Sequence, residues 1–158
     1  YEKKYYQAYR IMDSLIRDYP ANPVFLRWHA AMAYSVGFYS KALQSMNIYE
    51  KRIREGYAFY QEHQLRLVYY RKGLIAQRQK KWPEALEFYD MALEPLPGKI
   101  EKEMERYRVM STINKAYCLR RLGRKEEALR VYEKVLREPD IDGTHTRARE
   151  AIKALSDH

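Results

Sequence analysis

The 158-residue chain has one cysteine, six glycines and six prolines, and it has no long uninterrupted apolar run. Its lone thiol, Cys118, excludes an internal disulfide and a metal site of several cysteines, and it does not indicate a cellular compartment. Scarce glycine and proline are typical of long helices with short connections. No segment approaches the roughly 18 apolar residues of a membrane helix, so the sequence predicts no membrane span.

Residue patterns that indicate catalysis are also missing. The sequence contains no HExxH motif, glycine-rich phosphate loop, GxSxG motif or pair of cysteines with metal spacing. The four histidines are scattered along the chain: His29, His63, His145 and His158. We interpret His29 as a packed histidine and Cys118 as a small buried apolar residue. The sequence therefore predicts no enzyme, no catalytic residue, no metal and no cofactor.

The balance of charge is basic, with 30 lysines and arginines against 21 acidic residues and a formal net charge of +9. Long-range attraction then favours an acidic partner, an anionic peptide or a nucleic acid. The alternative is that much of this charge lies on solvated helix faces and serves solubility. Apolar residues make up 46% of the chain, which is enough to build a core along its length.

An internal repeat organises the chain. Four alanines, Ala8, Ala42, Ala85 and Ala128, lie in similar surroundings, at intervals of 34, 43 and 43 residues. Each is followed by a large residue four positions later and another apolar residue seven positions later. This spacing marks one face of a helix. A repeat of this length predicts stacked helical units and an all-α fold that presents a surface.

Proline, glycine and asparagine indicate where the helices begin and end. Asn22 is placed to cap a helix that starts at Pro23, and Gly37 is placed to end it. The predicted segments are a first helix at 3–19, three repeats at 23–55, 64–97 and 99–139, and a capping helix at 144–156. The second interval is nine residues longer than the first, and we expect residues 50–63 to prolong the helices on both sides of Gly56.

Four copies of one residue pattern resemble the tetratricopeptide repeat family. The third copy carries Gly73, Ala76, Ala85, Tyr89, Ala92 and Pro97. The fourth carries Ala116, Leu119, Ala128, Tyr132 and Val135, with Asp140 in place of the proline. The second carries Ala30, Ala33, Ala42, Met46 and Tyr49, and the first shows only Ala8, Met12, Leu15 and Pro20. The 43-residue period is nine longer than the usual 34 of the family, which indicates lengthened helices.

This resemblance implies a right-handed α-solenoid in which residues 1–158 form a single domain of three helix pairs, a preceding helix and a cap. It also implies a non-catalytic scaffold that binds a peptide or partner segment on a concave face formed by the first helix of each pair. Carried over by position, the candidate partner-binding residues are Arg27, Tyr34, Tyr70, Arg71, Arg78, Asn114, Tyr117, Arg120 and Arg121. Because guanidinium groups pair with carboxylates, an acidic or C-terminal segment is the expected ligand.

Three other readings stay open. The tyrosines could pack between helices while the arginines are solvated. Tyrosines with excess lysine and arginine could instead bind single-stranded RNA. The first helix exposes Ile11, Met12 and Leu15, which could support self-association. Because residue 1 is Tyr and lies in a helical pattern, we also expect the chain to be part of a longer protein.

Overall fold

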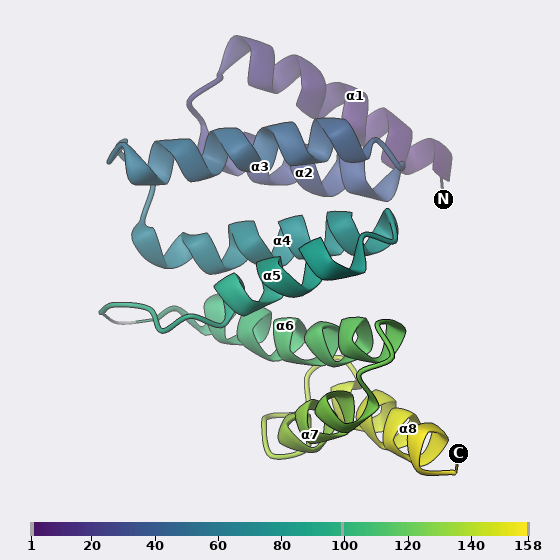
Figure 1. Cartoon of the computed structure of the whole chain (residues 1–158). Coiled ribbons are helices and arrows are strands. Elements are labelled where there is room, and N and C mark those ends of the chain that lie inside the picture. Colours follow the sequence, from purple (N-terminus) through teal and green to yellow (C-terminus); the bar gives the residue numbers. More distant parts are fainter. Residues whose placement is uncertain (1, 99, 158) are drawn as a thin grey trace. The chain divides into compact units, whose positions relative to one another are not determined.

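In the computed structural model, the described residues 2–98 and 100–157 form α-helices joined by turns. In chain order the helices are α1 (Glu2–Asp18), α2 (Pro23–Ser35), α3 (Tyr39–Arg54), α4 (Leu65–Arg78), α5 (Trp82–Ala92), α6 (Lys102–Arg121), α7 (Lys125–Val135) and α8 (Thr144–Ser156) (Figure 1). A short 3-10 helix, η1 (Glu62–Gln64), precedes α4. No β-strand occurs within these two ranges, and the predicted all-α fold of repeated helix pairs is confirmed.

The residues that bound α2 act as the sequence predicts. The Oδ1 atom of Asn22 accepts hydrogen bonds from the backbone N–H groups of Val24 at 2.9 Å and Phe25 at 3.2 Å. These bonds satisfy two of the amide groups that have no partner within the first helical turn. Pro23 occupies the first helical position, and Gly37 beyond the other end has a φ of 83°. A left-handed residue of this kind ends a helix at little cost when it is glycine.

The chain divides into two compact units, one comprising the residues up to Val68 and the other the residues from Tyr69 onward. The boundary falls inside α4. In the first unit α1 packs on α2, and α2 packs on α3 (Figure 1). The core of this unit contains Leu26, Ala30, Met46, Tyr49, Ile53, Tyr60 and Val68. The repeated residues of α3, which are Ala42, Met46 and Tyr49, are all buried, as the spacing of its apolar residues predicts.

The expectation that residues 50–63 prolong the helices on both sides of Gly56 is wrong for one of the two helices. Only the helix before Gly56 is prolonged, because α3 continues to Arg54. After Gly56 the chain makes turns and the short helix η1 before α4 begins at Leu65. Gly56 itself has a φ of 71°, which terminates α3. The second helix therefore gains no length, and the extra residues form a connection that packs back on the unit.

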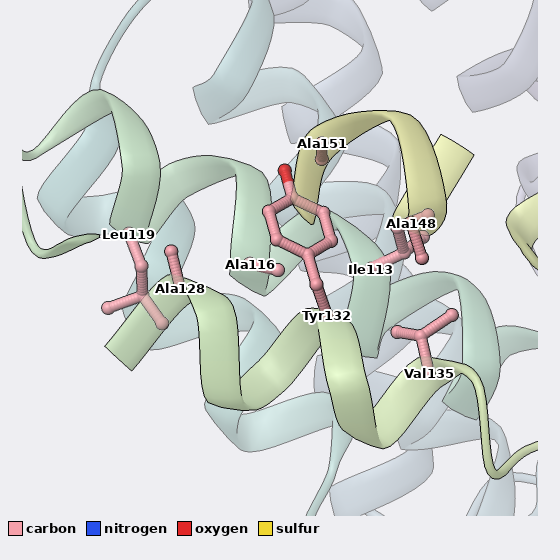
Figure 2. Close-up of a cluster of buried hydrophobic side chains, with 8 residues drawn as sticks. All are labelled: Ile113, Ala116, Leu119, Ala128, Tyr132, Val135, Ala148 and Ala151. Atoms are coloured by element: carbon pink, nitrogen blue, oxygen red, sulfur yellow. The ribbon is translucent and has the colours of Figure 1, made fainter. Parts of the chain in front are cut away.

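In the second unit, neighbouring helices in the sequence also pack on each other: α5 on α6, α6 on α7, and α7 on α8. One cluster joins the last three of them through Ile113, Ala116, Leu119, Ala128, Tyr132, Val135, Ala148 and Ala151 (Figure 2). Ala116 and Ala128 are fully buried at the place where α6 meets α7. Their small side chains let the two backbones approach, while Tyr132 fills the space toward α8.

Helix α4 approaches α5 in the same manner through Gly73 and Tyr89. A Cβ atom added at Gly73 would lie 2.5 to 2.8 Å from atoms of the Tyr89 ring. Tyr89 is fully buried, and its hydroxyl group donates a 2.7 Å hydrogen bond to Oε1 of Gln77. Position 73 therefore requires glycine, because any side chain there would collide with the Tyr89 ring of the neighbouring helix.

The N-terminal part of α6 is tied to the connection between α7 and α8. The Arg108 guanidinium donates two hydrogen bonds to the carboxylate of Glu138, at 2.8 and 2.9 Å, and one to Glu105 at 2.9 Å. Arg106 pairs with Asp142 in the same connection. The predicted start of this helix, Lys99, lies outside the described residues, and α6 begins at Lys102.

Candidate functional site

The second unit contains a pocket with a volume of about 500 Å³. It is lined by Gln77 of α4, by Ile113, Asn114, Tyr117 and Arg120 of α6, by Tyr132 of α7, and by Arg147, Glu150, Ala151 and Ala154 of α8. This volume lies within the range of small-ligand sites, which are commonly 300–1,000 Å³. Three predicted partner-binding residues, Asn114, Tyr117 and Arg120, are thus brought together, because they recur on one face of α6.

The apolar side of the pocket continues into the core of the unit. Figure 2 shows the Tyr132 ring projecting from α7 toward α6 and toward α8, and Ala148 and Ala151 lie on α8. Tyr132 is 3% exposed and Ala151 is 7% exposed, so the apolar side is held by the same packing that joins the three helices. Small alanines on α8 leave the space that the pocket occupies.

The polar side of the pocket is held by hydrogen bonds from its own helix. The Asn114 side chain donates from Nδ2 to the backbone carbonyl of Met110 at 2.9 Å, which fixes the amide group and leaves its second N–H as a donor and Oδ1 as an acceptor. Burial raises the pKa of the Tyr132 phenol, and the neighbouring Arg120 guanidinium opposes that rise. The phenol is therefore un-ionised at neutral pH and presents a hydroxyl group beside a positive charge.

The charge of the pocket is positive on balance. Arg120 and Arg147 each carry one positive charge, and Glu150 carries one negative charge. Arg120 is exposed, so its guanidinium lies at the rim and is available to a ligand from solvent. Such a site favours a ligand with a carboxylate or another anion, held beside apolar atoms.

A second group of side chains adjoins the pocket through Tyr117. The Tyr117 and Trp82 rings meet edge to face with centroids 5.8 Å apart, and the guanidinium carbon of Arg121 lies 5.1 Å from the Trp82 ring centroid. Arg121 therefore stacks on Trp82 and does not line the pocket. Tyr117 belongs to both groups and is 36% exposed.

Residues 111–145 match the family model described as tetratricopeptide repeat. Over these residues the chain is similar to that family. The matched segment runs from the second half of α6 through α7 to the start of α8, and it includes the α6 and α7 residues that line the pocket. The resemblance found in the sequence is thereby confirmed. Tetratricopeptide repeats generally mediate protein–protein interactions, and the family is typically non-catalytic. No curated protein matches the chain.

The other predicted residues of the second unit lie away from the pocket. Tyr70 packs against Tyr107, with ring centroids 5.2 Å apart, so this tyrosine has a packing role. Arg71 is half-buried, and its Nε has no hydrogen-bond partner among the described residues. Arg78 is exposed at the end of α4. None of the three lines the pocket next to this tetratricopeptide repeat.

Arg27 and Tyr34 belong to the first unit and are both half-buried on α2. The Tyr34 ring lies 6.0 Å from the Tyr39 ring, at the turn between α2 and α3. Sequence reasoning missed the most exposed aromatic residue of α2, which is Trp28 at 56% exposure. Its position between the buried residues Leu26 and Ala30 could have identified it, because it falls outside the stripe that packs on α3.

The contribution of α8 was also missed by sequence reasoning. The sequence predicts a capping helix here and no binding residue on it, yet Arg147, Glu150, Ala151 and Ala154 form one wall of the pocket. These residues recur at intervals of three and four, as expected for one helix face. The sequence signal for this wall was the presence of charged and small residues on one face of α8. Small side chains on that face leave an open space between α8 and its neighbours.

The buried His29 connects the three helices of the first unit. Its Nε2 lies 3.1 Å from Oδ1 of Asp13 on α1, and its Nδ1 lies 2.5 Å from Oγ of Ser45 on α3. Burial is the main cause that lowers the pKa of His29, so the neutral ring donates from Nε2 to Asp13 and accepts from Ser45. A hydroxyl, an imidazole and a carboxylate in this order also occur in hydrolases. Here Ser45 is 1% exposed and His29 is 2% exposed, so this group holds helices together.

The structure confirms the interpretation of Cys118 as a small buried residue. The side chain is fully buried on α6, and burial raises the pKa of its thiol to about 12. A thiol with such a pKa is un-ionised at neutral pH and therefore a poor nucleophile. Across residues 2–98 and 100–157, no three histidine, cysteine or acidic side chains are grouped to hold a metal ion. Over the same residues, none of the helices combines the length and apolar character required to cross a bilayer.

Proposed function

We propose that the chain is a non-catalytic module that holds a segment of another protein, and that the pocket of the second unit receives an acidic side chain or terminal carboxylate of that segment. The observation that carries this proposal is the meeting of Asn114, Tyr117 and Arg120 with Arg147 around one pocket. Tyr117, Arg120 and Arg147 offer hydrogen-bond donors, and the Asn114 amide has a second N–H besides the one bonded to Met110. A carboxylate accepts several such bonds at once, and those from guanidinium groups are the strongest.

The pocket has room for more than an ionised group. Ile113, Ala151 and Ala154 give it an apolar side, against which the aliphatic part of a glutamate or a neighbouring apolar residue would pack. The negative charge of Glu150 would repel a second negative charge of the ligand on the α8 side of the pocket. We therefore expect one acidic group flanked by apolar residues, in preference to a run of several acidic residues.

The group formed by Trp82, Tyr117 and Arg121 extends this surface along α5 and α6. Aromatic and arginine side chains supply much of the binding energy in protein interfaces, because they bury a large area at a small entropic cost. Tyr117 connects the two parts, since its ring lines the pocket and also contacts Trp82. A bound segment would therefore run from the pocket toward Trp82.

The test uses an array of synthetic peptides in which a single glutamate is flanked by leucine or alanine, with each peptide matched to a glutamine form. We expect the chain to bind the glutamate peptides more tightly, and Arg120→Glu to weaken this binding by at least tenfold. Arg130→Glu is the matched control, because Arg130 is exposed on α7 and does not line the pocket. Equal binding of glutamate and glutamine peptides would overturn the proposal.

Binding of single-stranded RNA is distinguished in the same experiment by its dependence on salt. Contacts to many phosphates weaken steeply as salt rises, whereas one carboxylate held with apolar contacts depends on salt only modestly. A labelled uridine oligonucleotide is the comparison ligand. Tighter binding of this oligonucleotide than of any peptide, with a steep salt slope, would favour the nucleic-acid reading.

A further inference from the structure

Helix α1 presents one face that does not pack on the first unit. Tyr9 and Ile16 lie on the inner face, where Tyr9 is buried and Ile16 packs on the core. A second face carries Lys4, Ala8, Ile11, Leu15 and Asp18 at intervals of four, three, four and three residues. This is the spacing of a seam along which one helix packs on another. Ile11, at its centre, is 59% exposed, the largest value for an apolar residue of α1.

The internal repeat shows what this face normally contacts. The residues of α3 that correspond to Ala8, Ile11 and Leu15 are Ala42, Ser45 and Tyr49, and all three are buried. In α1, Ala8 and Leu15 are only half-buried, and Ile11 is exposed. The sequence of α1 is therefore suited to a helix partner on this face, and the described residues of the first unit do not provide one.

We propose that this face of α1, which we call the α1 seam (Lys4, Ala8, Ile11, Leu15 and Asp18), binds the α1 seam of a second copy of the chain in antiparallel orientation. This surface is separate from the pocket of the second unit. The resulting contact is a two-fold dimer in which each copy contributes the same residues.

The charges at the two ends of the seam select this orientation. A two-fold axis at Ile11 places Ile11 against its own equivalent and Lys4 against Asp18 of the second copy, while Ala8 faces Ser14 of the second copy, one residue before Leu15. Both ends then join opposite charges. A parallel arrangement would place lysine against lysine and aspartate against aspartate, which is unfavourable. The charge of Arg17 is already used within the helix, where it pairs with Asp13 at 2.5 Å.

The size of the seam predicts a weak and reversible dimer. A helix of 17 residues is about 25 Å long, and only one of its faces is in contact. Ala8 and Ser14 are both small, so they allow close approach of the two backbones where they face each other. Such a contact is smaller than a standard stable interface, so we expect dissociation in the micromolar range.

The test is sedimentation equilibrium of the 158-residue chain over a wide range of concentrations. We expect a monomer–dimer equilibrium, and Ile11→Asp should raise the dissociation constant at least tenfold. Val24→Asp is the matched control, because Val24 is also exposed, at 53%, and lies on α2 outside the seam. Circular dichroism checks that both variants fold. A chain that stays monomeric at millimolar concentration, or equal effects of the two variants, would overturn the proposal.

Exchange of the two end charges tests the orientation separately. Lys4→Asp and Asp18→Lys should each raise the dissociation constant, since each places like charges opposite one another at both ends. The double variant should restore dimerisation, because it exchanges the two partners of each pair. Failure of the double variant to recover would exclude the antiparallel register.

Discussion

At the scale of single residues, close contacts between helices depend on a few small side chains. Gly73 lies where α4 approaches α5, and a Cβ atom there would fall within 3 Å of the Tyr89 ring. The ring cannot easily move, because it is fully buried and its hydroxyl group is bonded to Gln77. Alanine is normally preferred to glycine within a helix by about 1 kcal/mol. At this position the steric effect opposes that preference.

We predict that Gly73→Ala lowers the free energy of unfolding by about 1–3 kcal/mol, in spite of the gain in helix propensity. Urea unfolding followed by circular dichroism measures this change. Combining Gly73→Ala with Tyr89→Leu should cost less than the two single changes added together, since the leucine side chain leaves room for the new methyl group. Additive costs would show that Tyr89 is not the residue that excludes a side chain.

The tyrosines show why residue roles are difficult to read from spacing alone. Tyr70 and Tyr117 both lie on first helices of the repeat, and the sequence predicts both as partner-binding residues. Tyr70 packs on Tyr107, whereas Tyr117 is partly exposed beside a pocket. The difference depends on the prolonged N-terminal part of α6, which supplies Tyr107. Neighbours contributed by a departure from the usual repeat length are not visible in a repeat pattern.

At the scale of structural elements, the connection between α3 and η1 shows how extra residues are accommodated. Tyr60 is 8% exposed, and its hydroxyl group donates a 2.9 Å hydrogen bond to the backbone carbonyl of Ala21. Its ring lies 4.9 Å from the Tyr49 ring. Arg52 also donates to the carbonyl of Pro20, beside Ala21. The connection therefore fastens the end of α3 to the turn between α1 and α2.

We predict that Tyr60→Phe lowers the free energy of unfolding by about 1–2 kcal/mol, because the carbonyl of Ala21 loses its hydrogen-bond donor while the ring stays in place. Tyr57→Phe is the control, since Tyr57 belongs to the same connection and is 47% exposed. That change should alter stability by less than 0.5 kcal/mol. Equal effects of the two substitutions in urea unfolding would argue that the hydroxyl of Tyr60 has no structural role.

At the scale of the whole molecule, the sequence predicts the helices well and the pocket only in part. Asn22, Pro23 and Gly37 act locally, so the ends of α2 follow from propensity and capping. The small residues of the repeat predict which helices pair, because they require close contact over a short sequence distance. The pocket also needs Arg147 and Glu150 from α8. Their participation depends on how α8 packs on α7, which no local pattern specifies.

The hydrogen bonds of His29 illustrate the same limit in the first unit. Asp13 and Ser45 each lie sixteen residues from His29 in the sequence, and they meet it only when three helices are packed. The sequence predicts a packed histidine but not its partners. Because these bonds form only in the folded state, they connect the stability of the chain to pH.

We predict that the chain becomes less stable as pH falls below about 6.5. In the unfolded chain His29 has its ordinary pKa near 6.5, whereas burial lowers the pKa of His29 in the folded state. The unfolded state therefore binds more protons than the folded state over this window, and the free energy of unfolding falls with pH, by at most about 1.4 kcal/mol per pH unit. Arg17 and His29 also lower the pKa of Asp13, whose contribution is lost at more acid pH, so both effects have the same sign.

Urea unfolding at a series of pH values between 8 and 5 measures this dependence, and His29→Gln separates it from other titrating groups. The variant should be less stable at pH 8, because glutamine does not reproduce the bonds to Asp13 and Ser45 in the same geometry. Between pH 7 and 5 its stability should change less than that of the parent chain, since the group that titrates in this window is gone. A pH slope that survives the substitution unchanged would assign the acid sensitivity to groups other than His29.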